Sequence, residues 1–167
     1  MRDATTDPQH EIRNPVRLLM HVPVPWVFVL TYLAGLVVER TGVSFNGSNL
    51  LHGTVVIGGV LFGVGVVIAG WAQWLFRKAR TTTVPGQRSA SLVTSGPYRF
   101  TRNPMYVGLT LAYLGEAGML RQLWPIVLLP LTIAYLNWVV IPVEEGRLHE
   151  AFGQDYARYR ARVRRWA

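Results

Sequence analysis

Residues 92–106 read LVTSGPYRFTRNPMY and form a polar segment between two long apolar stretches of the chain. Gly96-Pro97 is a turn dipeptide. Asn103-Pro104 is typical of a helix start, with Asn103 as the N-cap and Pro104 in the first helical position. The segment therefore predicts a turn that leads directly into a helix.

Arg99 and Arg102 stand just before this predicted helix, and Tyr98 and Tyr106 lie on either side of them. The free N–H groups and the dipole at a helix N-terminus attract anions. The segment is therefore a candidate anion site. The alternative is a loop beside the membrane whose arginines only set the orientation of the protein.

The composition is that of a membrane domain. Half of the 167 residues are hydrophobic and 16% are charged, compared with about 25% charged residues in soluble domains. We expect residues 1–167 to form a single integral membrane domain. The absence of cysteine excludes disulfides and thiol catalysis, and the four scattered histidines predict no metal site. The net charge of +8 favours contact with anionic lipid head groups over contact with nucleic acid.

Four apolar stretches alternate with polar segments, at residues 22–38, 51–76, 104–120 and 123–143. Each has about the length that a membrane-spanning helix needs. They predict an all-α, polytopic membrane protein with four transmembrane helices, of which the last two form a helical hairpin. In the second stretch, Gly59, Gly63 and Gly70 lie near one face, where small residues let helices approach closely in lipid.

The tail after the fourth stretch begins with Glu144 and Glu145 and is amphipathic. Gly153 is expected to break it into two helices. The apolar residues of the tail recur at steps of three and four, as on one helical face: Leu148, Phe152, Tyr156, Tyr159, Val163 and Trp166. Arginines fill the other face, so we expect these amphipathic helices to lie at the cytoplasmic face of the membrane or over the bundle.

The basic residues predict the orientation of the protein in the membrane. Three lie before the first stretch, six in residues 77–103 and six in the tail, while the two remaining loops hold one each. Because cytoplasmic loops carry the excess of Lys and Arg, we expect both termini and the long loop in the cytoplasm, in a multi-pass protein of a prokaryotic plasma membrane. The tyrosines and arginines of the loop then come close to Glu144 and Glu145.

This meeting of polar segments has two explanations. In the structural one, the carboxylates pair with Arg99, Arg102 or Arg147, because unpartnered charges at the end of an apolar helix are costly. In the functional one, the segments form a pocket at the water–lipid boundary. It offers a helix N-terminus for a carboxylate, carboxylates for hydroxyl or amino groups, and aromatic rings for a flat base or a cation. A zwitterionic, nucleotide-like cofactor matches that set.

Two blocks of the sequence carry a resemblance to a known family. GPYRFTRNPMYVG at residues 96–108, followed by EE…FG..Y..Y from residue 144, resembles the isoprenylcysteine carboxyl methyltransferase family. Its wider group includes phospholipid N-methyltransferases. The resemblance covers residues 77–166, so this part is expected to be the cofactor-binding half, and residues 22–76 to supply two N-terminal spans.

The resemblance implies an integral membrane methyltransferase with S-adenosylmethionine as its cofactor and an active site in the cytoplasm. The positions that match the cofactor-binding residues of the family are Ala90, Ser91, Leu92, Val93, Tyr98, Asn103, Pro104, Met105, Tyr106 and Glu144. The candidate catalytic residues are Arg99, Arg102, Glu145 and Arg147.

Two positions depart from the family pattern. Eukaryotic members carry His where Asn103 stands, and Asn is a replacement donor. They also place an arginine on the substrate four residues before the glutamate, where this chain has Val140. A carboxylate acceptor loses that partner, and Arg99, Arg102 or Arg147 is expected to contact it instead.

We expect direct in-line methyl transfer to a lipophilic acceptor, such as the carboxylate of a prenylated or other lipid-like substrate. A carboxylate acceptor needs no base, whereas an amine or a hydroxyl needs one, and Glu145 or Glu144 is the candidate. Positioning and the exclusion of water are expected to supply most of the rate.

Three other functions stay open at this point. They are an N-methyltransferase for phospholipids or amines, an NADPH-dependent membrane reductase of similar architecture, and a non-enzymatic membrane scaffold that pairs through Gly59 and Gly63. The expected partners are membrane lipids and a lipophilic or lipidated substrate, without nucleic acid. The oligomeric state is left undecided.

Overall fold

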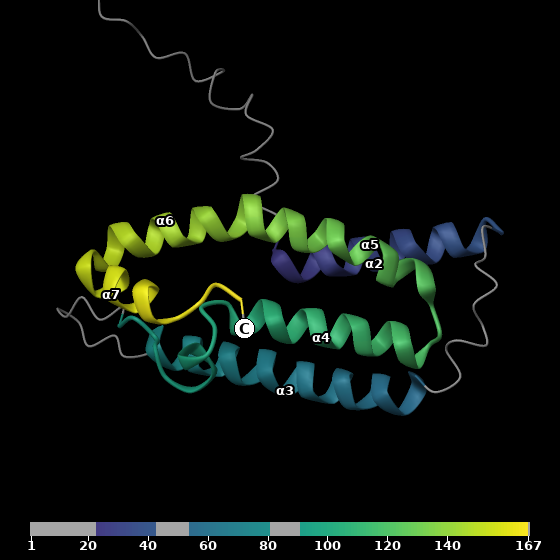
Figure 1. Cartoon of the computed structure of the whole chain (residues 1–167), viewed down its shortest axis with the longest axis horizontal. Coiled ribbons are helices and arrows are strands. Elements are labelled where there is room, and N and C mark those ends of the chain that lie inside the picture. The colour runs from purple at the N-terminus through teal and green to yellow at the C-terminus, as the bar shows by residue number, and fades with distance from the viewer. Residues whose placement is uncertain (1–22, 43–53, 81–90, 167) are drawn as a thin grey trace, which may run out of the picture.

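The computed structural model describes residues 23–42, 54–80 and 91–166. These residues form helices that lie roughly along one long axis (Figure 1). In chain order the elements are α2 (Val24–Arg40), α3 (Thr54–Arg80), η2 (Gly96–Arg99), α4 (Pro104–Met119), α5 (Leu123–Tyr135), η3 (Leu136–Val140), α6 (Ile141–Phe152) and α7 (Gln154–Arg162). The predicted all-α class is confirmed over the described residues.

Two helical segments are long and apolar enough to cross a membrane, Val55–Ala79 and Leu123–Phe152. The second joins α5, η3 and α6 into one continuous helix, so the helix that contains the predicted fourth span continues past Val143 and the two glutamates. With 17 and 16 residues, α2 and α4 are shorter. The predicted four-span topology therefore stays a prediction.

Glycines bring α3 and α4 into close contact. A Cβ atom added at Gly108 would lie 2.6 Å from the backbone nitrogen of Ala69, and one added at Gly58 would lie 2.7 Å from the carbonyl oxygen of Gly115. Real Cβ atoms do not approach backbone so closely, so the two helices pack at a distance that only glycine permits.

The glycines predicted for this packing were the wrong ones. Gly59, Gly63 and Gly70 have open space where a Cβ would stand. Gly58 and Gly65, seven residues apart, face α4 instead. A spacing of four and a spacing of seven both keep small residues on one helical face, and only the position of the partner helix decides which face is packed.

The turn between α4 and α5 is fastened to α2. Tyr32 donates a hydrogen bond to the side-chain oxygen of Gln122 at 2.5 Å, and Tyr113 donates one to the carbonyl oxygen of Pro125 at 2.9 Å. The rings of Tyr32 and Tyr113 meet edge to face, with centroids 5.0 Å apart. α4 and α5 are thus antiparallel neighbours in the chain, as predicted for a hairpin, although α4 packs mainly on α3 and α5 on α2 (Figure 1).

The tail folds back over one end of the bundle. Gly153 has a φ of 50° and separates α6 from α7, which confirms the predicted break. After α7 the chain returns to the start of α4 (Figure 1). There Thr101 and Arg164 form an isolated parallel β-bridge, in which the backbone N–H of Arg102 donates to the carbonyl of Arg164 at 2.9 Å.

Candidate active site

A short hydrogen bond joins the two motif blocks. Tyr106, in the first turn of α4, donates its hydroxyl proton to a carboxylate oxygen of Glu144 on α6, at 2.6 Å. Tyr106 is only 2% exposed. This contact joins residues 38 positions apart, and it confirms that the polar segments at both ends of the hairpin fold onto each other.

A cavity of about 290 Å³ opens beside this hydrogen bond. Its wall combines one carboxylate, one guanidinium and two phenols with apolar side chains. The lining residues are Pro23, Val24, Pro25, Met105, Tyr106, Tyr135, Val140, Val143, Glu144 and Arg147. Small-molecule sites have this character, mostly apolar with a few polar groups, and the volume is at the lower end of their range of about 300–1,000 Å³.

Tyr98, on η2, lies near the same carboxylate. Burial and then the charge of Glu144 raise the pKa of the Tyr98 phenol above its ordinary value, so it stays a neutral hydroxyl at pH 7. Its backbone carbonyl accepts a hydrogen bond from the Tyr159 hydroxyl at 2.7 Å. α7 thereby holds the loop that carries Tyr98 against the bundle.

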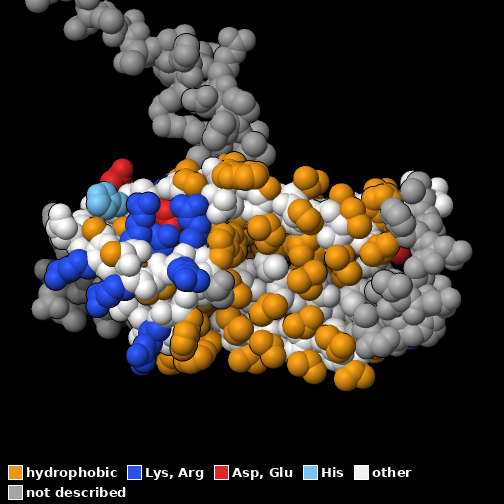
Figure 2. Space-filling model, viewed as in Figure 1, with side chains coloured by type: hydrophobic (Ala, Val, Ile, Leu, Met, Phe, Trp, Pro, Cys, Tyr) orange, Lys and Arg blue, Asp and Glu red, His pale blue; other side chains and the backbone are white. Residues whose placement is uncertain are grey.

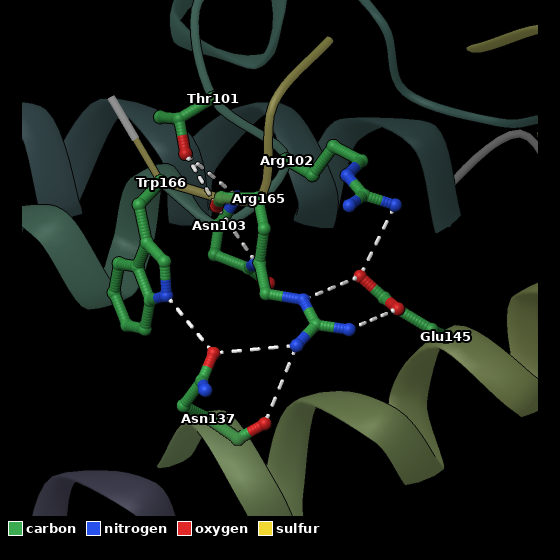
Figure 3. Close-up of polar contacts among 7 residues, drawn as sticks. All are labelled: Thr101, Arg102, Asn103, Asn137, Glu145, Arg165 and Trp166. Carbon is green, nitrogen blue, oxygen red and sulfur yellow. Dashed lines mark hydrogen bonds and ion pairs between the residues drawn. The ribbon is translucent and has the colours of Figure 1, made fainter. Parts of the chain in front are cut away.

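Glu145 has a different environment from its neighbour (Figure 3). Its carboxylate is 9% exposed and receives two N–H groups of Arg165, at 3.1 and 2.7 Å. On its other side, Arg102 forms an ion pair with it at 3.1 Å. We call Glu145, Arg102 and Arg165 the arginine clamp.

The arginine clamp is also hydrogen-bonded to Asn137 on η3. Arg165 donates to the side-chain oxygen of Asn137 at 3.2 Å, and the indole N–H of Trp166 donates to the same oxygen at 3.2 Å. The backbone carbonyl of Arg165 accepts hydrogen bonds from Thr101 at 2.9 Å and from the Asn103 side chain at 3.0 Å. The tail therefore ties α6 and η3 to the loop before α4 (Figure 3).

This arrangement corrects the predicted role of Asn103 at the helix start. α4 does begin at Pro104, with Asn103 in the N-cap position, but the Asn103 side chain makes no capping hydrogen bond. Its NH2 group donates to the tail instead, because the returning backbone of Arg165 offers a carbonyl that accepts from both Asn103 and Thr101. The bond fixes the loop against the tail.

The predicted site residues are only partly brought together. Met105, Tyr106, Glu144 and Arg147 line the cavity, and Tyr98 lies near it. Among the other predicted cofactor residues, Pro104 is buried, Leu92 and Val93 are partly exposed, and Ser91 is exposed. Of the predicted catalytic residues, Arg102 and Glu145 lie in the arginine clamp, Arg99 is exposed on η2, and Arg147 is exposed at the cavity. Ala90 lies outside the described residues.

Sequence reasoning missed Arg165 and Asn137. Arg165 is one of six arginines in the tail, and no periodicity distinguishes it from the solvated ones. Asn137 offers a clearer signal, since it is the only strongly polar side chain in the apolar stretch 123–143 apart from Thr132. It lies on η3, a π-helical turn, and such turns are frequent at functional sites.

Comparisons with known proteins bear on the same region. A family model described as phospholipid methyltransferase matches residues 54–155. Cobalt-zinc-cadmium resistance protein CzcN of Cupriavidus metallidurans is 38% identical over 77 residues, which cover 45% of this chain and 36% of that protein. Nickel-cobalt-cadmium resistance protein NccN of Alcaligenes xylosoxydans xylosoxydans is 34% identical with the same coverage. The match thus spans about a third of each relative, and no solved structure matches significantly. Within the described ranges, no three side chains of the metal-binding types gather.

Proposed function

Because the chain belongs to the phospholipid methyltransferase family and is therefore a membrane methyltransferase, we propose that it transfers a methyl group from S-adenosylmethionine to a lipophilic acceptor at the cytoplasmic face of the membrane. The observation that carries the proposal is the 2.6 Å hydrogen bond between Tyr106 and Glu144 on the wall of a cavity. It unites the two blocks of sequence that resemble the cofactor-binding segments of the family.

The residues at the cavity fit this cofactor by their chemistry. Glu144 offers a carboxylate for amino or hydroxyl groups, and Arg147 offers a guanidinium for a carboxylate. The rings of Tyr106 and Tyr135 supply faces that attract a cation. When bound, S-adenosylmethionine supplies a methyl group on a positively charged sulfur.

The chain's own residues then have separate tasks. Tyr106 donates to one oxygen of Glu144 and so holds that carboxylate in one orientation at the cavity. Tyr135, Val140 and Val143 line the same cavity with a ring and aliphatic side chains, and we assign to them the exclusion of water around the bound donor. Positioning and exclusion of water are the main contributions that we assign to the protein.

The acceptor class follows from the same groups. For an amine or a hydroxyl acceptor, Glu144 is a better candidate base than Glu145, because both oxygens of Glu145 are already engaged by arginines. For a carboxylate acceptor no base is needed, and Arg147 is the cation at the cavity. We therefore keep both a lipid-like carboxylate and a phospholipid or other amine as acceptors.

The reductase and the scaffold are less well supported. A pyrophosphate-containing dinucleotide needs several basic contacts, whereas among the described residues Arg147 alone is a basic side chain on the wall of the cavity of about 290 Å³. A scaffold has no need of a half-buried carboxylate held by a phenol, since placing a charge beside an apolar helix is costly. Neither alternative accounts for the Tyr106–Glu144 contact.

Two experiments test the proposed function. Calorimetric titration of the purified protein in uncharged detergent with S-adenosylmethionine and with S-adenosylhomocysteine should show saturable binding of both, and NADPH should not bind. Absence of binding for both adenosyl compounds would refute the proposal. Incubating membranes that contain the protein with methyl-labelled donor, followed by separation of lipids and peptides, should then identify the acceptor.

A further inference from the structure

A second hollow lies between α4 and α5 and is bordered by the tail. This groove of about 680 Å³ is lined by Leu114 on α4, by Ile126, Pro130 and Ile133 on α5, and by Trp166. Its polar side-chain groups are the amide of Asn137 and the indole N–H groups of Trp138 and Trp166, and the Trp166 N–H donates to the Asn137 oxygen at 3.2 Å. The groove therefore suits an apolar chain rather than a polar ligand.

One wall of the groove is a candidate membrane-spanning helix. Its α5 wall belongs to Leu123–Phe152, one of the two segments apolar enough to cross a membrane. Leu131, on the same helix, is 65% exposed, and Trp138 is 74% exposed. Figure 2 shows hydrophobic side chains over most of this face and Lys and Arg side chains gathered at one end.

That end carries an excess of positive charge beside the groove. Asn137 lines the groove and also receives Arg165 at 3.2 Å, so the arginine clamp adjoins the polar end of the groove. The arginine clamp holds two guanidinium groups against the single carboxylate of Glu145. The apolar groove thus ends beside a cluster in which positive charge exceeds negative charge. Such a groove is complementary to an amphiphile with an anionic head group at the membrane interface.

We propose that this groove binds one apolar chain of an anionic membrane amphiphile, with its head group beside Arg165. A chain in the groove gains close van der Waals contacts with the apolar side chains that line it. Trp166 provides an amphipathic ring of the kind that commonly lies at head-group level. The inference goes beyond the proposed function, because it concerns a second hollow and does not depend on methyl transfer.

Photolabelling of the purified full-length protein in uncharged detergent tests this inference. The probe is a long-chain fatty acid with a diazirine in its chain, compared with the fatty alcohol of the same chain. After irradiation and digestion, we expect the label on the α4 and α5 residues that line the groove. The acid should label about fivefold more than the alcohol, which corresponds to one favourable cation at the head group.

Two variants that fill the groove sharpen the test. Ala134→Trp on α5 and Leu114→Trp on α4 should each remove most of the labelling, because both residues line the groove. Leu131→Trp is the matched control, since Leu131 is on the same helix but outside the groove, and it should keep the labelling.

Several results would overturn the inference: equal labelling by acid and alcohol, labelling that survives both filling variants, or labelling that falls as protein concentration rises. The last would assign the groove to a second copy of the chain. Titration of S-adenosylhomocysteine into the same samples separates this inference from the proposed function, because the filling variants should leave donor binding unchanged.

Discussion

Glu144 and Glu145 are adjacent in the chain, yet they lie in two different environments. Successive residues of an α-helix point about 100° apart, so α6 directs Glu144 to the cavity and Glu145 to the arginine clamp. Glu144 has a neutral phenol as its hydrogen-bond donor, whereas Glu145 has two guanidinium groups. One carboxylate therefore faces a cavity, whereas the other holds the tail in place.

The largest expected effect is the loss of stability in Glu145→Gln. Removing this carboxylate leaves the guanidinium of Arg102, whose side chain is 11% exposed, without its counter-charge. A broken buried ion pair costs about 3 kcal/mol of unfolding free energy, which denaturant unfolding in detergent would measure. If Glu144→Gln lowers stability as much as Glu145→Gln, the distinction between the two carboxylates fails.

The next effect is on donor binding in Glu144→Gln. Loss of the charge that faces the cavity should weaken binding of S-adenosylhomocysteine by about tenfold, roughly 1.4 kcal/mol, while the unfolding free energy changes little. Calorimetry on the folded fraction of each variant should show a smaller loss for Glu145→Gln. Glu116→Gln, which changes an exposed carboxylate near the other end of α4, is the control and should bind like the unaltered protein.

A smaller effect is expected for Tyr106→Phe. The ring still fills its buried site, but Glu144 loses the hydroxyl that orients its carboxylate. One hydrogen bond of this kind contributes about 1 kcal/mol, so donor affinity should fall about fivefold. Unchanged affinity in the same titration would mean that the contact between Tyr106 and Glu144 serves packing alone.

The smallest effect is expected for Asp155→Asn. Asp155 pairs with Arg158 at 2.6 Å, but both side chains are about 70% exposed. Solvent-exposed ion pairs contribute less than about 0.5 kcal/mol, so denaturant unfolding should hardly change. If Asp155→Asn lost as much unfolding free energy as Glu145→Gln, burial would not explain why the Glu145 ion pairs stabilise the protein more than the Asp155 ion pair.

Some features of the site and of the fold could be predicted from the sequence, and others could not. Tyr106 and Glu144 were predicted as one site because two motif blocks carry them, and the structure joins them by a hydrogen bond. The break at Gly153 was also readable, since glycine tolerates its positive φ of 50°. Arg165 was not, because local pattern does not tell one arginine of a basic tail from the next.

The sequence also did not show which face of a helix packs against its neighbour. The spacing of Gly59 and Gly63 satisfied the rule for close helix packing, but α4 lies against Gly58 and Gly65. Small residues lie on both faces of α3, so the sequence of α3 alone does not show which face packs against α4. The Asn103 side chain shows the same limit, since its oxygen can accept a capping bond and its NH2 group can donate to the returning tail, and the structure makes only the second bond.

By itself, the sequence determined the helical class, the membrane character and the family, because apolar length, composition and motif order are local properties of the chain. Only the tertiary structure decided which glycines touch, which arginine holds Glu145, and that Glu144 faces a cavity. Those outcomes depend on contacts between residues far apart in the chain, which no local pattern of the sequence encodes.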